Sequence, residues 1–189
     1  MTSSAPLKME IENPLPQADP LPRVGVLFTR RLCLEPIRLD DLDAMHGIVN
    51  ETSVCRFLFH NQAMSRERLR TLLALSERQF RESGTGIWAL RKRDDERMIG
   101  FFCLWPLVVS REKEIGFALS SVHWGNGYAT EAGVALIDYV REHLGWERLQ
   151  ASTDLGNNRS ILTLWRLDFV ESALIRGPAG PLRVFKRKP

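Results

Sequence analysis

A stretch with two glycines two residues apart is the part of this sequence best suited to chemistry. It reads His123-Trp-Gly-Asn-Gly-Tyr-Ala-Thr130 and lies between a strand-like run and a helix-like run. Glycine lets the backbone turn tightly and approach a ligand closely, and Thr130 is predicted to cap the helix that follows. The first N–H groups of a helix have no partner within it and carry the positive end of its dipole. The stretch therefore predicts a site for a phosphate-containing ligand.

Two other phosphate-binding motifs fit these glycines incompletely. A nucleoside-triphosphate loop needs a Lys followed by Ser or Thr after its last glycine, and neither is present here. A dinucleotide fingerprint needs a third small residue, where Thr130 stands, and an acidic residue at the end of the next strand. Glu147 is at about the right distance but precedes that strand. Neither motif is complete.

Three segments in register match the motifs of one known family. They are Glu114-Ile-Gly-Phe117 with the glycine loop, Asp154-Leu-Gly-Asn-Asn-Arg-Ser-Ile161 with Leu167-Asp-Phe169, and Thr29-Arg-Arg-Leu-Cys-Leu34. Over about residues 28–187 the chain resembles the GNAT (GCN5-related) N-acetyltransferases, and most closely their ribosomal-protein N-terminal acetyltransferase-like branch. One Gly-x-Gly is a weak signal, whereas three motifs in order are a specific one.

The resemblance implies that acetyl-coenzyme A (acetyl-CoA) is the acetyl donor. Loop amides would hold its pyrophosphate, the preceding strand would pair with its pantetheine arm, and an asparagine would bond that arm. These residues are Trp124, Gly125, Asn126, Gly127, Tyr128, Ala129 and Thr130 for the pyrophosphate, and Phe117, Ala118, Leu119 and Asn157 for the arm. Three structural alternatives stay open: Trp124 packing on the sheet, an ordinary strand at 117–119, and Asn157 as a helix cap.

The resemblance also implies the catalytic residues. A neutral amine must attack the thioester, so a general base must take a proton, and Glu114 matches the family's glutamate. Its alternative role is a surface carboxylate paired with Lys113 or with a neighbouring strand. Many family members protonate the leaving thiolate with a late tyrosine, but no tyrosine follows Tyr139. Ser160 matches the serine of the branch and can hydrogen-bond the sulfur; a helix first-turn role or protonation by solvent are the alternatives.

The acceptor amine is less constrained than the donor. We expect a protein or peptide N-terminal amine, whose pKa of about 7.7–8.0 leaves a good fraction neutral, whereas a lysine amine titrates near 10.4. A small-molecule amine, such as a polyamine or aminoglycoside, is the enzymatic alternative, although residues 50–70 are more basic than acidic. A coenzyme A-binding module without turnover is the alternative from another class.

The pattern of elements predicts a mixed α/β domain. Residues 1–22 hold five of the ten prolines and are expected to form a flexible tail, followed by one acetyltransferase domain over 23–189. The expected strands are 31–35, 87–91, 98–105, 112–119, 148–153, 169–175 and 182–186, and the expected helices follow Asp40 or Asp41, Ser65, Thr130 and Asn157 or Asn158. We predict a central, mostly antiparallel sheet of about six to seven strands flanked by helices, as in the GNAT fold.

Composition excludes several other classes. The chain of 189 residues has 26 basic and 23 acidic residues, closely interspersed, which argues against a nucleic-acid partner. No run of about 18 apolar residues predicts a membrane span. Three widely spaced cysteines and four histidines show no metal-ligand spacing, so we expect no metal. Free thiols fit the cytoplasm, and the chain is expected to be a monomer or a homodimer.

Two positions depart from the family pattern. Asp168 stands where the family has a glycine that ends the helix, and Trp165 stands where a charged residue is usual. Asp tolerates the left-handed conformation better than most residues, so we expect a modest energetic cost at Asp168 rather than a lost fold.

Overall fold

A single mixed sheet with helices on both faces forms the domain. The computed structural model describes residues 25–106, 113–177 and 180–188; the predicted tail, residues 1–22, lies outside them. The strands are β1 (Leu27–Phe28), β2 (Leu32–Pro36), β3 (Gly86–Lys92), β4 (Asp95–Pro106), β5 (Lys113–Leu119), β6 (Leu149–Asp154), β7 (Val170–Gly177) and β8 (Gly180–Arg187). The helices are η1 (Leu39–Asp41), α1 (Leu42–Val49), α2 (Thr52–Leu58), α3 (Arg66–Ser83), η2 (Ser121–His123), α4 (Tyr128–Tyr139), η3 (Val140–Leu144) and α5 (Asn158–Arg166).

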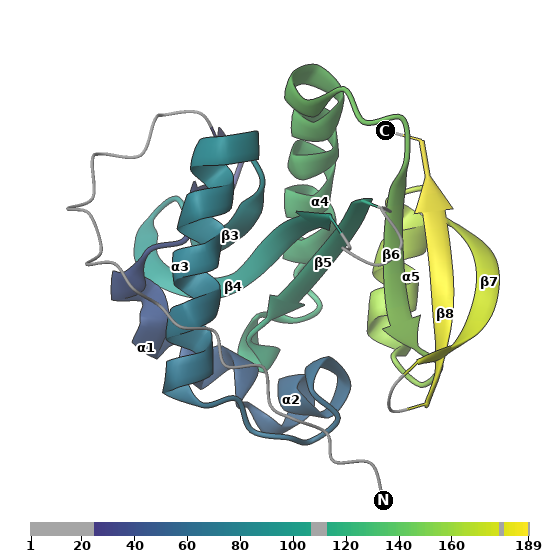
Figure 1. Cartoon of the computed structure of the whole chain (residues 1–189), viewed down its shortest axis with the longest axis horizontal. Coiled ribbons are helices and arrows are strands. Elements are labelled where there is room, and N and C mark those ends of the chain that lie inside the picture. The colour runs from purple at the N-terminus through teal and green to yellow at the C-terminus, as the bar shows by residue number, and fades with distance from the viewer. Residues whose placement is uncertain (1–24, 107–112, 178–179, 189) are drawn as a thin grey trace, which may run out of the picture.

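The sheet has the strand order β1-β2-β3-β4-β5-β6-β8-β7. All neighbouring strands are antiparallel except β5 and β6, which run parallel and are in register only at Glu114 and Gln150. Beyond that pair the two strands separate, as the ribbons of β5 and β6 show (Figure 1). The predicted fold class is therefore confirmed, with eight strands in place of six to seven.

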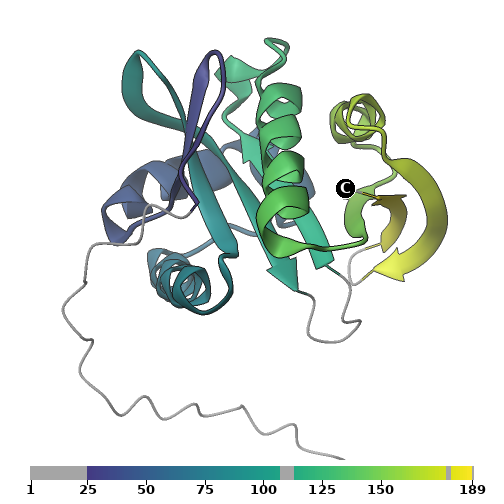
Figure 2. The same cartoon turned by 90° about the horizontal axis from the view of Figure 1, so that it is seen from above.

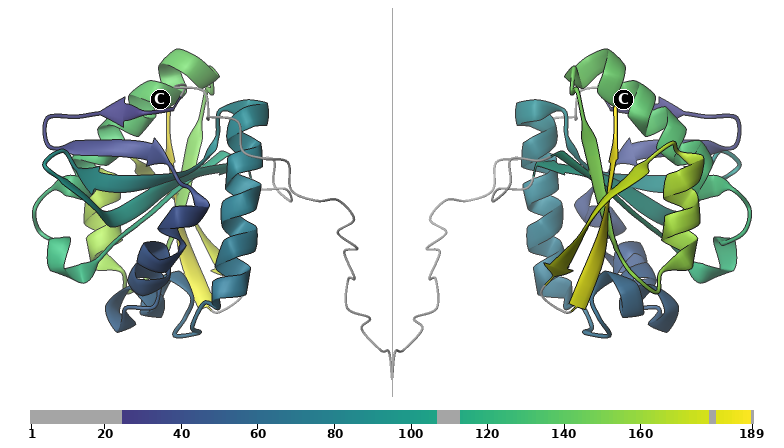
Figure 3. Two further views of the ribbon diagram at one scale, coloured as in Figure 1. Left: turned by 90° about the vertical axis from the view of Figure 1, so that its left-hand side faces the viewer. Right: turned by 90° about the vertical axis from the view of Figure 1, so that its right-hand side faces the viewer.

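Two apolar clusters cover the two faces of the sheet. Helices α4 and α5 pack on one face around Trp88, Phe102 and Phe185, and α1 and α3 pack on the other around Ile87 and Phe101. Figures 2 and 3 show this arrangement, with α4 and α3 on opposite sides of the strands. In the described residues, none of the helices combines the length and the apolar character that a membrane span requires.

The local signals in the sequence set several helix ends. Ser65 caps α3 by accepting a hydrogen bond from the N–H of Arg68 at 3.2 Å, and Gly84 ends that helix in the left-handed conformation (φ 67°). Asn157 caps α5 by accepting from the N–H of Ser160. Asp168 has φ 58°, as expected of the residue that replaces the family's glycine.

One local prediction differs from the structure, and one helix was not predicted. Thr130 does not cap α4; Gly127 does, with φ 76°, so the helix begins at Tyr128 and Thr130 lies in its first turn. A glycine without Cβ enters the helix from the left-handed region, which a capping threonine would not do. The sequence pattern did not predict α2, because its seven residues are too few for a clear helical period.

Candidate active site

The glycine loop presents a row of backbone donors at the start of α4. Gly125 and Gly127 are both left-handed, with φ of 79° and 76°. Among the described residues, no backbone N–H of residues 125–130 donates a hydrogen bond to a protein acceptor. Adjacent free N–H groups at the positive end of a helix dipole form an anion site. The exposed donors of residues 125–130 are therefore suited to a negatively charged group.

The first turn of α4 is fixed to the β1–β2 turn by Glu131. Its Oε1 accepts from the hydroxyl of Thr29 at 2.5 Å and from the N–H of Arg31 at 2.9 Å, and its Oε2 lies 2.7 Å from Arg31 Nε. Burial raises the pKa of Glu131, but these hydrogen bonds and the charge of Arg31 outweigh it and hold the pKa below its usual value. Arg31 also lies over the ring of Tyr128 at 4.7 Å. The network holds the loop in place and puts one cation beside it.

Trp124 is bound to the strand that precedes the loop. Its indole Nε1 donates to the carbonyl of Leu119 at 2.8 Å, and the guanidinium of Arg159 lies 5.1 Å from its ring centre. The side-chain amide of Asn126 donates to the carbonyls of His123 and Trp124, both at 3.1 Å. The side chains of the loop therefore brace its backbone. The N–H of Trp124, predicted with the loop donors, donates instead to the carbonyl of Ser121 at 3.2 Å, whereas those of residues 125–130 remain available among the described residues.

Backbone groups of β5 face β6 where the two strands separate. Ser120 donates its N–H to Ile99 at 2.9 Å, and bonded pairs alternate along antiparallel strands. The peptide groups of Ala118 consequently face β4, while those of Phe117 and Leu119 face β6. The carbonyl of Leu119 is already occupied by Trp124. Phe117 thus offers both a donor and an acceptor on the open side of β5.

Asn157 and Ser160 stand at the start of α5, beside the other strand of the split. Asn157 Oδ1 accepts from the N–H of Ser160 at 3.3 Å. Within the described part of the chain, the Asn157 side-chain NH₂ and the Ser160 hydroxyl have no hydrogen-bond partner. Both groups are partly exposed. Each can therefore bond a ligand while the cap persists.

Glu114 lies at the point where β5 and β6 join. The hydroxyl of Ser152 on β6 donates to Glu114 Oε1 at 2.5 Å. Among the described residues, Glu114 Oε2 has no partner, and Lys113 lies instead over the ring of Trp146 at 4.8 Å. The alternative pairing with Lys113 is thus not what the structure shows, whereas the alternative contact with a neighbouring strand is present as the bond to Ser152. One carboxylate oxygen is left to accept a proton.

The loop and Glu114 lie on opposite faces of the sheet. Along β5, Ile115, Phe117 and Leu119 pack with the α4 and α5 cluster, and Ala118 packs with the α1 and α3 cluster. Alternation along a strand places Glu114 with Ala118. Next to Glu114, β5 and β6 share one register pair, and beyond it the ladder between the two faces is open.

The comparisons with known proteins agree with this geometry. A family model described as an acetyltransferase (GNAT) domain matches residues 31–170. The chain belongs to the GNAT acetyltransferase family. Among curated relatives, the uncharacterized N-acetyltransferase p20 of Bacillus licheniformis is 28% identical over 156 residues, covering 79% of this chain and 85% of p20. The uncharacterized N-acetyltransferase YoaA of Bacillus subtilis is 26% identical over 152 residues, covering 80% of this chain and 86% of YoaA.

Solved structures share the fold of this acetyltransferase. An acetyltransferase from Agrobacterium tumefaciens has a TM-score of 0.75 at 22% identity and covers 94% of this chain and 99% of its own. RimL, a ribosomal L7/L12 alpha-N-protein acetyltransferase solved with coenzyme A, has a TM-score of 0.72 at 15% identity. The match covers 86% of this chain and 97% of RimL. The chain is an N-acetyltransferase that uses acetyl-CoA and an amine acceptor. A binding module without turnover is not what its relatives indicate.

Cys103 is not a suitable acetyl carrier in this acetyltransferase. Burial and the nearby Glu114 carboxylate raise the pKa of the Cys103 thiol to about 12. The thiolate is the nucleophile in cysteine chemistry, and it is scarce at neutral pH when the pKa is that high. Cys103 is therefore a poor nucleophile for carrying an acetyl group.

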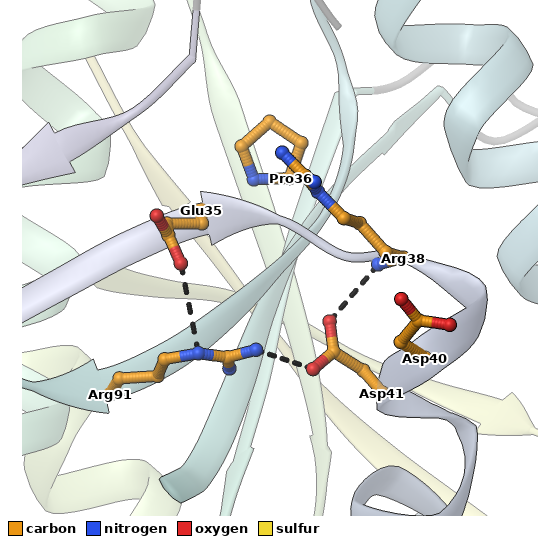
Figure 4. A pocket seen from close by; sticks show the side chains of 6 residues that line it. All are labelled: Glu35, Pro36, Arg38, Asp40, Asp41 and Arg91. Atoms are coloured by element: carbon orange, nitrogen blue, oxygen red, sulfur yellow. Dashed lines mark hydrogen bonds and ion pairs between the residues drawn. The ribbon is translucent and has the colours of Figure 1, made fainter. Parts of the chain in front are cut away.

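A separate hollow lies where β2 ends and η1 begins (Figure 4). It is lined by Glu35, Pro36, Arg38, Asp40, Asp41 and Arg91. Arg91 lies between two carboxylates: it donates to Asp41, and its Nε is 3.6 Å from Glu35 Oε2. None of the lining residues comes from the loop, β5 or β6, so this hollow is not part of the acetyltransferase site. Over the described ranges, no group of three His, Cys, Asp or Glu is placed to hold a metal ion.

Proposed function

We propose that this acetyltransferase modifies the N-terminal α-amine of a protein or peptide, with Glu114 as the general base. The observation that carries the proposal is the Glu114–Ser152 hydrogen bond at the joint of β5 and β6, with Glu114 Oε2 free of described partners. An α-amine has a pKa of about 7.7–8.0, so its deprotonation makes a smaller demand on a single carboxylate than that of a lysine amine would. RimL, whose fold is shared, acts on an α-amine of ribosomal L7/L12.

The donor would be held by residues on the α4–α5 side of the sheet. The free N–H groups of residues 125–130 fit a pyrophosphate, and the exposed peptide groups of Phe117 fit an amide-bearing arm. The unpaired NH₂ of Asn157 fits a carbonyl of the same arm. Acetyl-CoA, when bound there, supplies the thioester from which the acetyl group is transferred.

Two side chains of this chain would assist the transfer, and one of them, Glu114, would move a proton. Glu114 takes one proton from the attacking amine, while Ser152 holds its other carboxylate oxygen in place. The free hydroxyl of Ser160 is available to donate a hydrogen bond to the departing sulfur. A serine is a weak acid, so its contribution is to stabilise the thiolate until solvent protonates it.

The test is an assay of thiol release with acetyl-CoA and short peptides. Half of the peptides carry a free N-terminus and half are blocked there but keep a lysine, and mass spectrometry locates the acetyl group. We expect α-acetylation of the free peptides, and Glu114→Gln should lower kcat by about a hundredfold or more. Glu147→Gln, an exposed glutamate before β6, is the matched control.

Each outcome has a distinct meaning. Acetylation confined to the lysine amine, or to polyamines added in parallel, would overturn the proposed acceptor while the N-acetyltransferase assignment stands. A Glu114→Gln variant as fast as the wild type would overturn the general base alone.

A further inference from the structure

The polar face of β6 extends from the base toward the α2–α3 turn. Leu149, Ala151 and Thr153 are buried, whereas Gln150, Ser152 and Asp154 are not. Ser152 and Asp154 therefore share one face of the strand, and Ser152 places that face on the Glu114 side. Two residues of a strand advance about 7 Å. Asp154 is thus a second carboxylate, two residues or about 7 Å along β6 beyond the Ser152 that binds the base.

Asp154 has a loose partner from the opposite half of the domain. His60 Nδ1 lies 3.7 Å from Asp154 Oδ2, which is longer than a hydrogen bond. His60 and Asn61 both have positive φ (51° and 65°), which turns the chain sharply between α2 and α3. Backbone outliers of this kind are frequent at ligand clamps. Asp154 and His60 lie on the same side of the sheet as Glu114, which is the side from which an acceptor would approach.

Two arginines of the α2–α3 region contact groups other than this carboxylate. Arg66 pairs with Asp43, and Arg56 lies over the ring of Phe57 at 5.1 Å. Residues 50–70 are basic, which suggested from the sequence that cationic acceptors would be disfavoured. Part of this positive charge is already in contact with other groups.

We infer that Asp154 selects acceptors with a basic side chain at their second or third residue, and that His60 occupies Asp154 until such an acceptor binds. An extended peptide advances about 3.3–3.6 Å per residue. A peptide with its α-amine at Glu114 therefore reaches Asp154 with its second or third residue. This inference rests on the proposed N-terminal acceptor.

The experiment compares three peptides that begin with alanine. One has alanine at positions two and three, and the others carry arginine at position two or three, since arginine is charged but is not an acetyl acceptor here. The readout is the ratio of kcat/KM between the arginine and alanine peptides, measured within each variant. For one partly exposed ion pair, we expect a wild-type ratio of about five.

Three variants identify the residue responsible. Asp154→Asn should bring the ratio to about one, and Asp138→Asn, which removes an exposed α4 carboxylate paired with Arg141, should leave it unchanged. His60→Gln should raise the ratio by lowering KM for the arginine peptides, since the partner that competes for Asp154 is gone. Melting temperatures confirm that each variant is folded.

The outcomes separate the two proposals. A ratio of one in the wild type, or a ratio that survives Asp154→Asn or disappears in His60→Gln, overturns the role of Asp154 while α-acetylation stands. If the alanine peptide is not acetylated at its α-amine, the proposed acceptor itself fails.

Discussion

The Ser152 hydroxyl donates a 2.5 Å hydrogen bond to Glu114 Oε1 and thereby ties β6 to β5 next to their single register pair. The bond has two consequences. It orients the carboxylate that we propose as the base, and it connects strands that otherwise separate.

Removing that hydroxyl should slow the reaction without abolishing it. In Ser152→Ala, Glu114 keeps its charge but loses its orientation, and one hydrogen bond to a charged group contributes about 1.5–3 kcal/mol. We expect kcat/KM to fall by about ten- to a hundredfold, less than in Glu114→Gln. Steady-state kinetics measure the effect, and Ser172→Ala, which removes a hydroxyl bonded to Val184 on β8, is the control. Equal losses in both variants would argue for a general effect on stability.

The glycine loop offers a test with a closely matched control. Gly125 (φ 79°) and Gly145 (φ 59°) are both left-handed, and a Cβ at either would meet no atom within 4 Å. Alanine should therefore cost about 1–2 kcal/mol of stability at either position through the backbone alone. Only Gly125→Ala should also weaken acetyl-CoA binding, because it alters the loop donors. Calorimetric titration with acetyl-CoA distinguishes them, and an equal Kd for both variants would contradict the loop assignment.

Glu131 should make the stability of the domain dependent on pH. Its pKa in the folded protein is lowered from 4.5, so its contribution is fully present above pH 4.5 and is lost as the pH falls through the folded value. Glu131→Gln should lower the free energy of unfolding by about 1–3 kcal/mol at pH 7.

The difference between wild type and Glu131→Gln should shrink as the pH is lowered from 5 toward 3. Urea unfolding at each pH measures it. The exposed i,i+4 pair of Arg78 and Glu82 supplies the control, since Glu82→Gln should cost about 0.3–0.5 kcal/mol. A constant difference for Glu131→Gln across this range would contradict the linkage.

Asp168 should be replaceable by glycine with a gain in stability. Its φ of 58° favours glycine, and its exposed side chain lies 4.0 Å from Arg187, which is a weak pairing. We expect Asp168→Gly to raise the free energy of unfolding by about 0.5–1 kcal/mol and Asp168→Ala to lower it. Thermal unfolding measures both, and a stabilised alanine variant would show that the backbone conformation is not the cause.

The sequence predicted more about the donor side of the proposed site than about the acceptor side. The loop, Asn157 and Ser160 are adjacent to helix starts, and capping and glycine patterns are local signals. The same local rules identified Ser65 as a cap and the left-handed backbone at Asp168. The N-cap of α4 was misplaced at Thr130, because a glycine in the left-handed region was not considered as the entry to the helix.

The residues that sequence reasoning missed depend on contacts between distant segments. Glu51, before α2, accepts from the N–H of Ser121 at 2.8 Å, and Ser152 meets Glu114 across the parallel pair. No periodicity brings residue 51 to residue 121. For Glu131 a signal did exist, since an acidic residue in the first turn of a helix is favoured at its positive end.

The single register pair between β5 and β6 also bears on how the two halves of the chain stay together. The strands before the loop and those after it share little of the backbone ladder at this junction, whereas every other strand pair has at least two register pairs. A donor lying between them and bonded to both would act as an internal cross-link. Its binding raises stability by RT ln(1 + [L]/Kd), about 2.7 kcal/mol at a hundredfold excess over Kd. In a cell the resistance of this enzyme to unfolding would then follow the supply of its own substrate.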